Sequence, residues 1–195
     1  MFCDLRENFV SFVVTLLMKL KQHVFLTGFM GSGKTTAGKT LATLLKTRFI
    51  DLDEYLEKKE NRTIPEIFEE DGEEKFRELE TKYLTEILKL KDPHVISLGG
   101  GTVCFNQNLE LVKKNGQLVY IELPINTLAE RIKESKFTRP LLKNLSTEEL
   151  IKNIEEILSE RKKYYEQAHI TVNGLNLTPQ LIQQKLFGSA KENTH

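Results

Sequence analysis

The stretch Gly28-Phe29-Met30-Gly31-Ser32-Gly33-Lys34-Thr35 decides the fold, because it fits the pattern G-x-x-x-x-G-K-[ST] between an apolar run and a stretch with helical spacing. Glycines let the backbone curl so that successive N–H groups face an anion, and the helix that follows adds the partial positive charge of its N-terminus. The lysine of such a loop reaches the outer phosphates of a nucleotide, and the next hydroxyl ligates Mg²⁺. The residues predicted to hold the nucleotide are Gly31, Ser32, Gly33, Lys34, Thr35 and Thr36. A glycine-rich turn with a surface lysine is the alternative, and the strand and helix on either side disfavour it.

Short apolar runs and amphipathic segments alternate around this loop. The runs, rich in β-branched and aromatic residues, are Val24–Thr27, Arg48–Asp51, Val95–Leu98, Leu118–Glu122 and Ile170–Val172. Apolar residues with helical spacing lie between them, over 37–45, 76–90 and 150–158. This alternation predicts an α/β fold with three layers, α/β/α, around a five-stranded parallel sheet. We expect His94 to be a turn residue before the third run.

Composition limits the classes of protein to which the chain can belong. The 195 residues suit one domain, and 28 basic side chains balance 28 acidic ones. Binding to a nucleic-acid backbone is driven by clustered positive charge, so this balance argues against nucleic acid as a partner. Two cysteines, Cys3 and Cys104, are too few for a disulfide framework or a four-ligand zinc site, which favours a cytoplasmic protein.

The N-terminal segment carries an apolar run over 9–17, about nine residues long. A membrane-spanning helix needs roughly twenty residues, so we expect no membrane span. The charges ahead of the run nearly cancel, and Lys19-Leu20-Lys21 follows where a signal-peptide cleavage site would lie. Met18 leads directly into the first predicted strand. We therefore interpret 1–17 as a non-native or disordered extension, with a short interfacial anchor as the alternative, and 18–195 as a single domain.

Two aspartates and a second glycine run follow predicted strands. Asp51 and Asp53 stand two apart at the end of the second run, so the alternation of a strand puts both carboxylates on one side, at the edge where open α/β sheets bind ligands. One can hold the water shell of a metal while the other faces an acceptor hydroxyl. A solvated strand end, or an N-cap made by Asp53, is the alternative. We interpret Gly99-Gly100-Gly101 as a source of backbone donors for a small polar substrate, rather than as a flexible turn.

The phosphate loop alone does not separate a GTPase, a motor ATPase and a small-molecule kinase. The chain has no Asn-Lys-x-Asp for guanine and neither the His-Arg-Asp nor the Asp-Phe-Gly of protein kinases. From about Val24 to Leu186 it resembles shikimate kinase, within the nucleoside-monophosphate-kinase-like P-loop group. The motifs that carry the resemblance, beside the phosphate loop, are Asp51-Leu52-Asp53, Ile67-Phe68, Gly72-Glu73, Phe76 to Glu80, Gly99 to Gly101, Arg139 to Leu142, and Glu160-Arg161 through Tyr165.

The resemblance implies an activity and roles for particular residues. The γ-phosphoryl group of MgATP would pass to the 3-hydroxyl of shikimate, giving shikimate 3-phosphate and ADP on the route to the aromatic amino acids. Lys34, Asp53 and Arg139 would be the catalytic residues. Lys34 and Arg139 would stabilise charge on the transferred group, and Asp53 would orient or deprotonate the attacking hydroxyl. Asp51 would support Mg²⁺ through water, beside Thr35.

The resemblance also implies an acceptor site and a set of partners. Arg77 and Arg161 would hold the shikimate carboxylate, because a planar guanidinium can pair with a carboxylate bidentately, and Gly99–Gly101 would lie beside them. Helices over about 52–80 would bind the substrate, and a lid over about 133–145 would close over the phosphates. We expect a cytoplasmic monomer that binds shikimate, ATP and Mg²⁺.

Some residues and the function itself keep more than one interpretation. Phe68 and Phe76 match aromatic positions that flank the substrate ring in the family, but their spacing alone favours the core. Glu80 lies three residues after Arg77, so the two can pair and preset the guanidinium. Arg131 stands about where the family has an arginine that stacks on adenine. The alternative functions are another P-loop kinase, such as a gluconate-type or nucleotide kinase, and a non-catalytic nucleotide-binding regulator.

Overall fold

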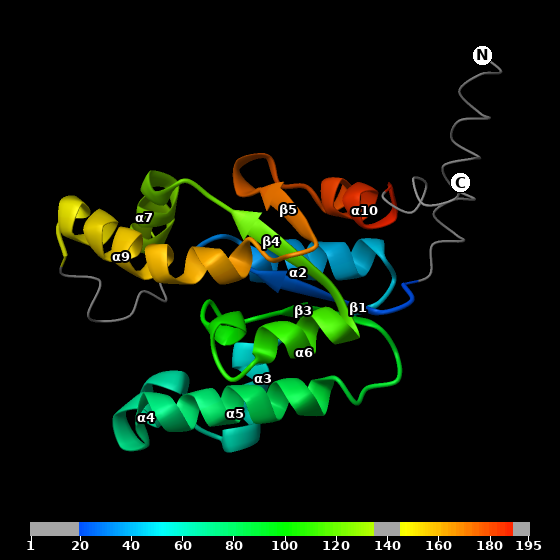
Figure 1. The fold of residues 1–195 in the computed structure, drawn as a ribbon, viewed down its shortest axis with the longest axis horizontal. Coiled ribbons are helices and arrows are strands. Elements are labelled where there is room, and N and C mark those ends of the chain that lie inside the picture. Colours follow the sequence, from blue (N-terminus) through cyan, green and yellow to red (C-terminus); the bar gives the residue numbers. More distant parts are fainter. Residues whose placement is uncertain (1–19, 135–144, 189–195) are drawn as a thin grey trace, which may run out of the picture.

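The computed structural model describes residues 20–134 and 145–188. Within these ranges strands alternate with helices, two of which, η1 and η2, are short 3₁₀ helices (Figure 1). The elements are, in chain order, β1 (His23–Thr27), α2 (Lys34–Leu44), β2 (Arg48–Asp51), α3 (Leu52–Glu60), α4 (Ile64–Glu70), α5 (Gly72–Ile87), β3 (His94–Ser97), η1 (Thr102–Cys104), α6 (Asn108–Asn115), β4 (Gly116–Glu122), α7 (Ile125–Glu134), α9 (Thr147–Tyr165), β5 (Ile170–Asn173), η2 (Gly174–Asn176) and α10 (Pro179–Gly188). Every predicted strand is present, with its bounds within two residues of the prediction.

The five strands form one parallel sheet in the order β2-β3-β1-β4-β5, which confirms the predicted fold class. β1 is central, and Val24 lies opposite Val95 on β3 and Gln117 on β4. After β1 the chain forms β2 and β3 on one side of β1, and it later crosses to β4 and β5 on the other side. Open α/β sheets bind ligands at such a reversal, outside the carboxyl ends of the strands. The loops after β1 and β3 lie side by side at this place.

Alternate residues of β1 pack against helices on opposite faces of the sheet. Phe25 packs in a cluster with residues of α3, α5 and α6, whereas Val24 and Leu26 pack in another with residues of α2 and α10. These two groups of helices cover opposite faces of the sheet (Figure 1). The alternation gives three layers, with an apolar cluster on each face of the sheet. A third cluster joins Phe29 of the phosphate loop to α7 and the first half of α9. The loop is therefore anchored by apolar packing as well as by its glycines.

Some predictions concern residues outside the described ranges. These are the extension 1–17, the start at Met18, Arg139, and most of the predicted lid, over 135–144. Among the helices of residues 20–134 and 145–188, none is long and apolar enough to cross a membrane.

Two histidines beside strand ends accept backbone hydrogen bonds. His23 Nδ1 accepts the N–H of His94 at 3.1 Å, and His169 Nδ1 accepts the N–H of Leu118 at 2.9 Å. The prediction of His94 as a turn residue was wrong, because it is the first residue of β3 and is buried beside the His23 ring. Burial lowers the pKa of both His23 and His169, and the neighbouring His94 and Lys113 respectively lower them further. Both acceptors therefore favour the neutral form.

We expect the free energy of unfolding to fall as the pH is lowered below about 6.5, the ordinary pKa of histidine. Below that pH the unfolded chain takes up protons at His23 and His169, whereas the folded chain takes them up only at a lower pH because both pKa values are lowered. The contribution of these two histidines to the free energy of unfolding is therefore complete above that pH, and it is lost as the pH falls through their folded pKa values. His169→Asn offers Leu118 an amide oxygen that does not titrate, so urea unfolding between about pH 7.5 and 5.5 should show a smaller loss. An equal loss in both proteins would contradict this account.

Candidate active site

The phosphate loop leaves β1 through glycines in the left-handed region of backbone space and enters α2. Gly28, Gly31 and Gly33 have φ angles of 142°, 78° and 92°, which other residues rarely adopt. A Cβ on Gly28 would also lie 2.6 Å from the carbonyl oxygen of Ile121. α2 begins at Lys34 with no side-chain cap and no acidic residue in its first turn, whereas α4 and α9 carry capping boxes. The first turn of α2 thus presents backbone N–H groups and a positive dipole end, the arrangement that binds phosphate.

Lys34 lies folded over this loop. Its Nζ donates to two carbonyl oxygens of the loop at 2.8 and 3.0 Å. Burial lowers the pKa of Lys34 to about 8, an effect that the carboxylates of Asp53 and Asp51 oppose and the charge of Arg161 reinforces. Four predicted site residues, from α2, β2, α3 and α9, therefore act on one another electrostatically. The remaining predicted loop residues follow the same turn, with Ser32 buried and Thr36 exposed.

Asp51 connects the phosphate loop to α3. It is the last residue of β2, its Oδ2 accepts the Thr35 hydroxyl at 2.8 Å, and its Oδ1 accepts the N–H of Asp53 at 3.1 Å. The prediction that strand alternation aligns the two aspartates was wrong, because α3 begins at Leu52 and Asp53 lies in its first turn. The N-cap is Asp51, not Asp53, since an aspartate there satisfies free N–H groups of the helix. Both carboxylates still act on Lys34.

The Thr35 hydroxyl and the Asp51 carboxylate form an oxygen pair suited to magnesium. Mg²⁺ prefers oxygen ligands, keeps several of its waters and is bound together with substrate phosphates rather than by a closed protein cage. Within residues 20–134 and 145–188, no group of three or more His, Cys, Asp or Glu side chains is placed to hold a metal ion. The two residues therefore fit an ion that arrives with a nucleotide.

The glycine run after β3 lies against charged side chains. A Cβ on Gly99 would lie 2.7 Å from Glu80 Oε1 and 2.9 Å from Asp53 Oδ1. A Cβ on Gly101 would lie 2.9 Å from both Nη atoms of Arg77. A larger residue at either place would displace a charged group. The run therefore permits close approach of the site's own side chains, and its role as a source of backbone donors stays a prediction.

Two guanidinium groups reach this run from different helices. Arg161 of α9 donates through Nη1 to the carbonyl oxygen of Gly100 at 3.2 Å, and the hydroxyl of Tyr165 donates to the same oxygen. Burial raises the pKa of Tyr165 well above its usual range, so its hydroxyl stays a donor. Arg77 of α5 lies against the next residue, Gly101. The two arginines that are predicted to hold a carboxylate thus meet at one strand end.

Arg77 is held by carboxylates on both sides. Its Nη1 donates to Glu80 Oε2 at 2.9 Å, and its Nη2 and Nε donate to Glu73 Oε1 at 3.0 and 3.2 Å. Glu80 is fully buried, whereas the Glu73 side chain is 59% exposed. The predicted pairing of Glu80 with Arg77 is therefore present. The hydroxyl of Thr102 donates to the other oxygen of Glu80. Sequence reasoning missed Thr102, whose one signal is its position directly after the glycine run.

Three further predictions concern side chains around this centre. Phe76 is buried in the core, and Phe68 packs against it with ring centroids 4.7 Å apart, in agreement with the core interpretation of the pair. Arg131 of α7 donates through Nη1 to the carbonyl oxygen of Gly31 at 3.4 Å. It therefore lies beside the phosphate loop, and its contact with adenine stays a prediction. Burial raises the pKa of the Cys104 thiol to about 11, so this thiol stays protonated.

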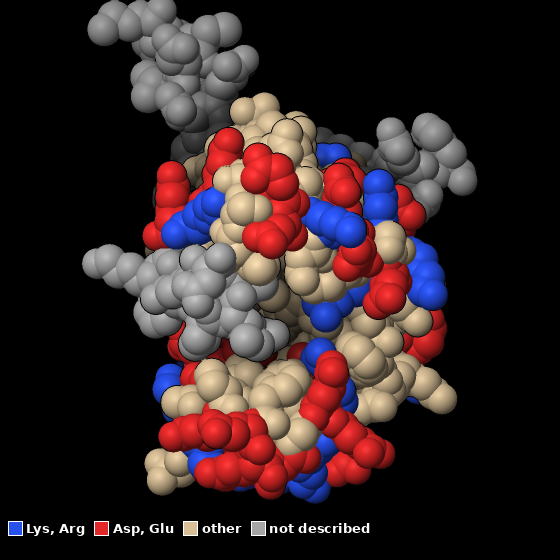
Figure 2. All heavy atoms as spheres, turned by 90° about the vertical axis from the view of Figure 1, so that its left-hand side faces the viewer, with Lys and Arg blue, Asp and Glu red and all other residues tan. Residues whose placement is uncertain are grey.

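The surface is hollowed at the end of the molecule that carries α4, α7 and α9, and basic side chains are visible inside the hollow (Figure 2). α7 and α9 lie on one side of it, and α4 and α5 lie on the other (Figure 1). Arg161 belongs to α9 and Arg77 to α5. The two guanidinium groups thus come from opposite sides of the hollow.

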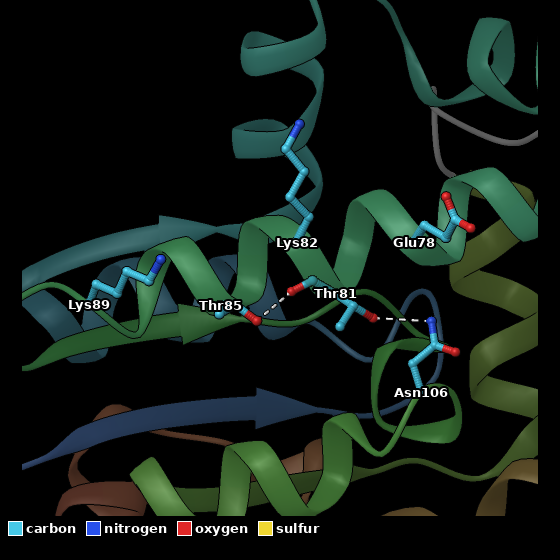
Figure 3. A pocket seen from close by; sticks show the side chains of 6 residues that line it. All are labelled: Glu78, Thr81, Lys82, Thr85, Lys89 and Asn106. Atoms are coloured by element: carbon cyan, nitrogen blue, oxygen red, sulfur yellow. Dashed lines mark hydrogen bonds between the residues drawn. The ribbon is translucent and has the colours of Figure 1, made fainter.

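A separate pocket lies along α5. It is lined by Glu78, Thr81, Lys82, Thr85, Lys89 and Asn106 (Figure 3). The hydroxyls of Thr81 and Thr85 donate to backbone carbonyls one turn earlier, and Lys82 contacts Glu60 and the hydroxyl of Tyr83. These polar groups are thus engaged within the protein. The pocket includes none of the predicted site residues.

The sequence is similar to known kinases over most of its length. The family model of shikimate kinase matches residues 30–190. The shikimate kinase of Parabacteroides distasonis is 45% identical over 150 residues, which cover 77% of this chain and 86% of that protein. The shikimate kinase of a Sulfurihydrogenibium species is 39% identical over 170 residues, which cover 87% of this chain and 98% of that protein.

Solved structures agree with the sequence comparison. The crystal structure of shikimate kinase from Bacteroides thetaiotaomicron matches with a TM-score of 0.79 at 37% identity and covers 87% of this chain and 98% of its own. Shikimate kinase from Acinetobacter baumannii, in complex with shikimate, matches with a TM-score of 0.79 at 32% identity over 92% of this chain and 99% of its own. A gluconokinase from Sinorhizobium meliloti reaches a TM-score of 0.54 at 16% identity, which shows a shared fold alone.

The lowered pKa of Lys34 predicts how nucleotide binding depends on pH. Because that pKa is about 8, the ammonium loses its charge above pH 8, and the affinity for ATP should fall by about tenfold per pH unit there. Phosphate groups complete their ionisation near pH 6, so the nucleotide itself does not titrate in this range. Binding titrations between about pH 7 and 9.5 check the result, with Lys34→Arg as the control, since a guanidinium keeps its charge. A constant ATP affinity in the unaltered protein would contradict the prediction.

Proposed function

Because the chain belongs to the shikimate kinase family, whose members use ATP to phosphorylate shikimate, we propose that the glycine run and its neighbours hold shikimate while the phosphate loop holds ATP. The γ-phosphoryl group passes to the 3-hydroxyl, and the products are shikimate 3-phosphate and ADP. The two loops follow the adjacent strands β1 and β3. Donor and acceptor would therefore meet outside the carboxyl ends of the sheet.

The convergence of two arginines on one strand end carries this proposal. Arg161 donates to the carbonyl oxygen of Gly100 at 3.2 Å, and Arg77 lies against Gly101. A planar guanidinium pairs with a carboxylate through two parallel hydrogen bonds, so two such groups fix both the position and the plane of one carboxylate. Shikimate carries a carboxylate and ring hydroxyls. The carboxylate therefore suits the two arginines, and the hydroxyls suit the nearby carboxylate of Asp53.

Asp53 would orient the attacking hydroxyl. Its Oδ1 lies beside Gly99, and its charge acts on Lys34, so the carboxylate stands between the acceptor loop and the phosphate loop. From this place it would accept a hydrogen bond from the acceptor hydroxyl and take its proton as the oxygen attacks. Phosphoryl transfer needs little covalent help from the protein, so alignment is the main contribution.

Lys34, Thr35 and the first turn of α2 would hold the phosphates. The ammonium of Lys34 donates to neutral carbonyl oxygens, and a phosphate oxygen would replace them with a charged acceptor. Thr35 and Asp51 would hold Mg²⁺, with Asp51 acting through water, and the ion would supply positive charge beside the phosphates. Arg139, outside the described residues, would add positive charge when the lid closes.

The alternative functions have less support. A gluconate-type kinase would share the fold, and the similarity to a gluconokinase at 16% identity extends no further than that. A non-catalytic regulator would have no use for a lysine of the phosphate loop grouped with Asp51 and Asp53. We also propose that the protein acts as a cytoplasmic monomer with small-molecule substrates.

The direct test is an assay of ADP release with shikimate, gluconate and nucleoside monophosphates as acceptors. We expect turnover with shikimate and background rates with the others. Arg77→Ala should weaken the binding of shikimate much more than that of ATP, because losing a charge-assisted contact costs about 1.5–3 kcal/mol. Turnover with gluconate or a nucleotide in place of shikimate would contradict the proposal. Equal losses of both affinities in Arg77→Ala would place this arginine outside the acceptor site.

Replacing each aspartate by asparagine should separate their roles. Asp51→Asn should mainly raise the Mg²⁺ requirement, because a higher metal concentration compensates for weaker support of its water shell. Asp53→Asn should lower kcat at every Mg²⁺ concentration, because an amide contacts the acceptor hydroxyls but cannot take a proton. The measurement is kcat and the KM for shikimate across a Mg²⁺ titration. Rescue of Asp53→Asn alone by excess Mg²⁺ would show that the two roles are reversed.

A further inference from the structure

An exposed aromatic ring lies beside the proposed acceptor site. Phe105 follows η1 directly and keeps 37% of its surface exposed. The Cζ atom of the Arg77 guanidinium lies over its ring, 4.2 Å from the centroid. Residues 20–134 and 145–188 form three apolar clusters, and Phe105 belongs to none of them. Core packing therefore does not explain the position of this side chain, whereas its contact with the Arg77 guanidinium does.

The segment that carries this ring is fastened to α5 on both sides of it. Ahead of the ring, the buried hydroxyl of Thr102 donates to Glu80. After the ring, the side-chain amide of Asn106 donates to the backbone carbonyl of Arg77 at 3.1 Å. It also donates to the hydroxyl of Thr81 at 3.2 Å (Figure 3). Asn106 has a φ of 51°, in the left-handed region that asparagine tolerates better than most residues. The ring is thus held in place from both sides.

A third contact fixes the segment to the helix that follows it. The side-chain amide of Asn108, at the start of α6, donates to the backbone carbonyl of Thr102 at 3.0 Å. Both residues are fully buried. Because a buried polar group that loses its partner destabilises the fold, these bonds resist opening and favour one conformation of the segment.

The ring supplies a contact to Arg77 that hydrogen bonds do not supply. Glu80 and Glu73 bind the edges of the guanidinium, because all its N–H groups lie in the plane of the group. Its faces have no donors, and aromatic rings are the groups that pack there. The guanidinium carbon lies over the rings of Phe105 and Phe76, 4.2 and 4.9 Å from their centroids. The carboxylates thus set the rotation of the guanidinium within its plane, and the rings set its tilt.

We propose that Phe105 is a positioning residue for substrate recognition: its ring holds the Arg77 guanidinium at the tilt in which it pairs with the substrate carboxylate. The inference rests on the proposed function and extends it to a residue that acts through Arg77. Stacking restricts the guanidinium without taking one of its N–H donors from the substrate. A guanidinium that is already oriented loses less freedom when a carboxylate binds, so the ring strengthens shikimate binding.

Three replacements of Phe105 distinguish the effect of its aromatic face from the effect of its apolar volume. Phe105→Ala should raise the KM for shikimate about three- to tenfold, with the KM for ATP and kcat changing less than about twofold. Phe105→Leu should show the same loss, because leucine keeps apolar volume without a π face, and Phe105→Tyr should restore the original KM. Leu90→Ala shortens another exposed apolar side chain and serves as the matched control, with no change expected. A Phe105→Leu protein with the original KM would overturn the proposal.

A double-mutant cycle shows whether the ring acts through Arg77. In an Arg77→Ala background, Phe105→Ala should weaken shikimate binding by less than about a further twofold, since its partner is already gone. Titration of shikimate binding gives this value without relying on turnover. A further three- to tenfold loss would show that the ring acts on another group, and would overturn the proposal.

Turnover by the unaltered protein distinguishes a failure of this inference from a failure of the proposed function on which it rests. Turnover of shikimate by that protein, together with an unchanged KM in Phe105→Ala, overturns the role of the ring and leaves the proposed function standing. Absence of turnover by the unaltered protein overturns both. Melting temperatures of the Phe105 variants within a few degrees of the original protein show that a changed KM does not arise from unfolding.

Discussion

The absence of side chains at Gly99–Gly101, just beyond the end of β3, is the constraint on which the site depends. A Cβ on Gly99 would come within 2.7 Å of Glu80 and 2.9 Å of Asp53, and one on Gly101 within 2.9 Å of Arg77. Side chains from α3 and α5 thus occupy the space that larger residues would need, and α9 contacts the backbone between these two glycines. β3 also pairs in parallel with β1, so the phosphate loop leaves the sheet beside this crowded strand end.

Charges of both signs lie close together around the two glycine-rich loops. The cations are Lys34, Arg77 and Arg161, and the anions are Asp51, Asp53 and Glu80. Carboxylates alone would repel one another strongly in a partly buried place, and the nearby cations offset that repulsion. Carbonyl oxygens of the two glycine-rich loops accept hydrogen bonds from Lys34 and Arg161, while carboxylates hold Arg77. A substrate that brings a carboxylate and a nucleotide that brings phosphates would therefore meet cations that are already oriented.

Local patterns in the sequence predict the fold and the phosphate loop, but they do not predict contacts made by folding. Glycine spacing and apolar runs are local signals, so the strands and the loop agree with the structure. Strand alternation does not predict how the side chains of Asp51 and Asp53 lie relative to each other, because Asp51 caps α3 and the helix begins at Leu52. Thr102 and Asn106 reach partners 22 and 29 residues earlier in the chain. Their role depends on how η1 lies against α5, and no spacing within the segment indicates it.

The division of two arginines between α5 and α9 bears on which acceptors the site selects. Arg77 and Arg161 lie against adjacent glycines, so their like charges repel, and the carboxylates of Glu80 and Glu73 beside Arg77 partly offset the repulsion. A neutral sugar in this place would leave that repulsion unchanged and would compete poorly with water for the guanidinium donors. A carboxylate placed between them would be attracted to both and would link helices on the two sides of the hollow. Selection for an acidic acceptor would therefore follow from the charges of the two cations, as well as from the hydrogen bonds that each one forms.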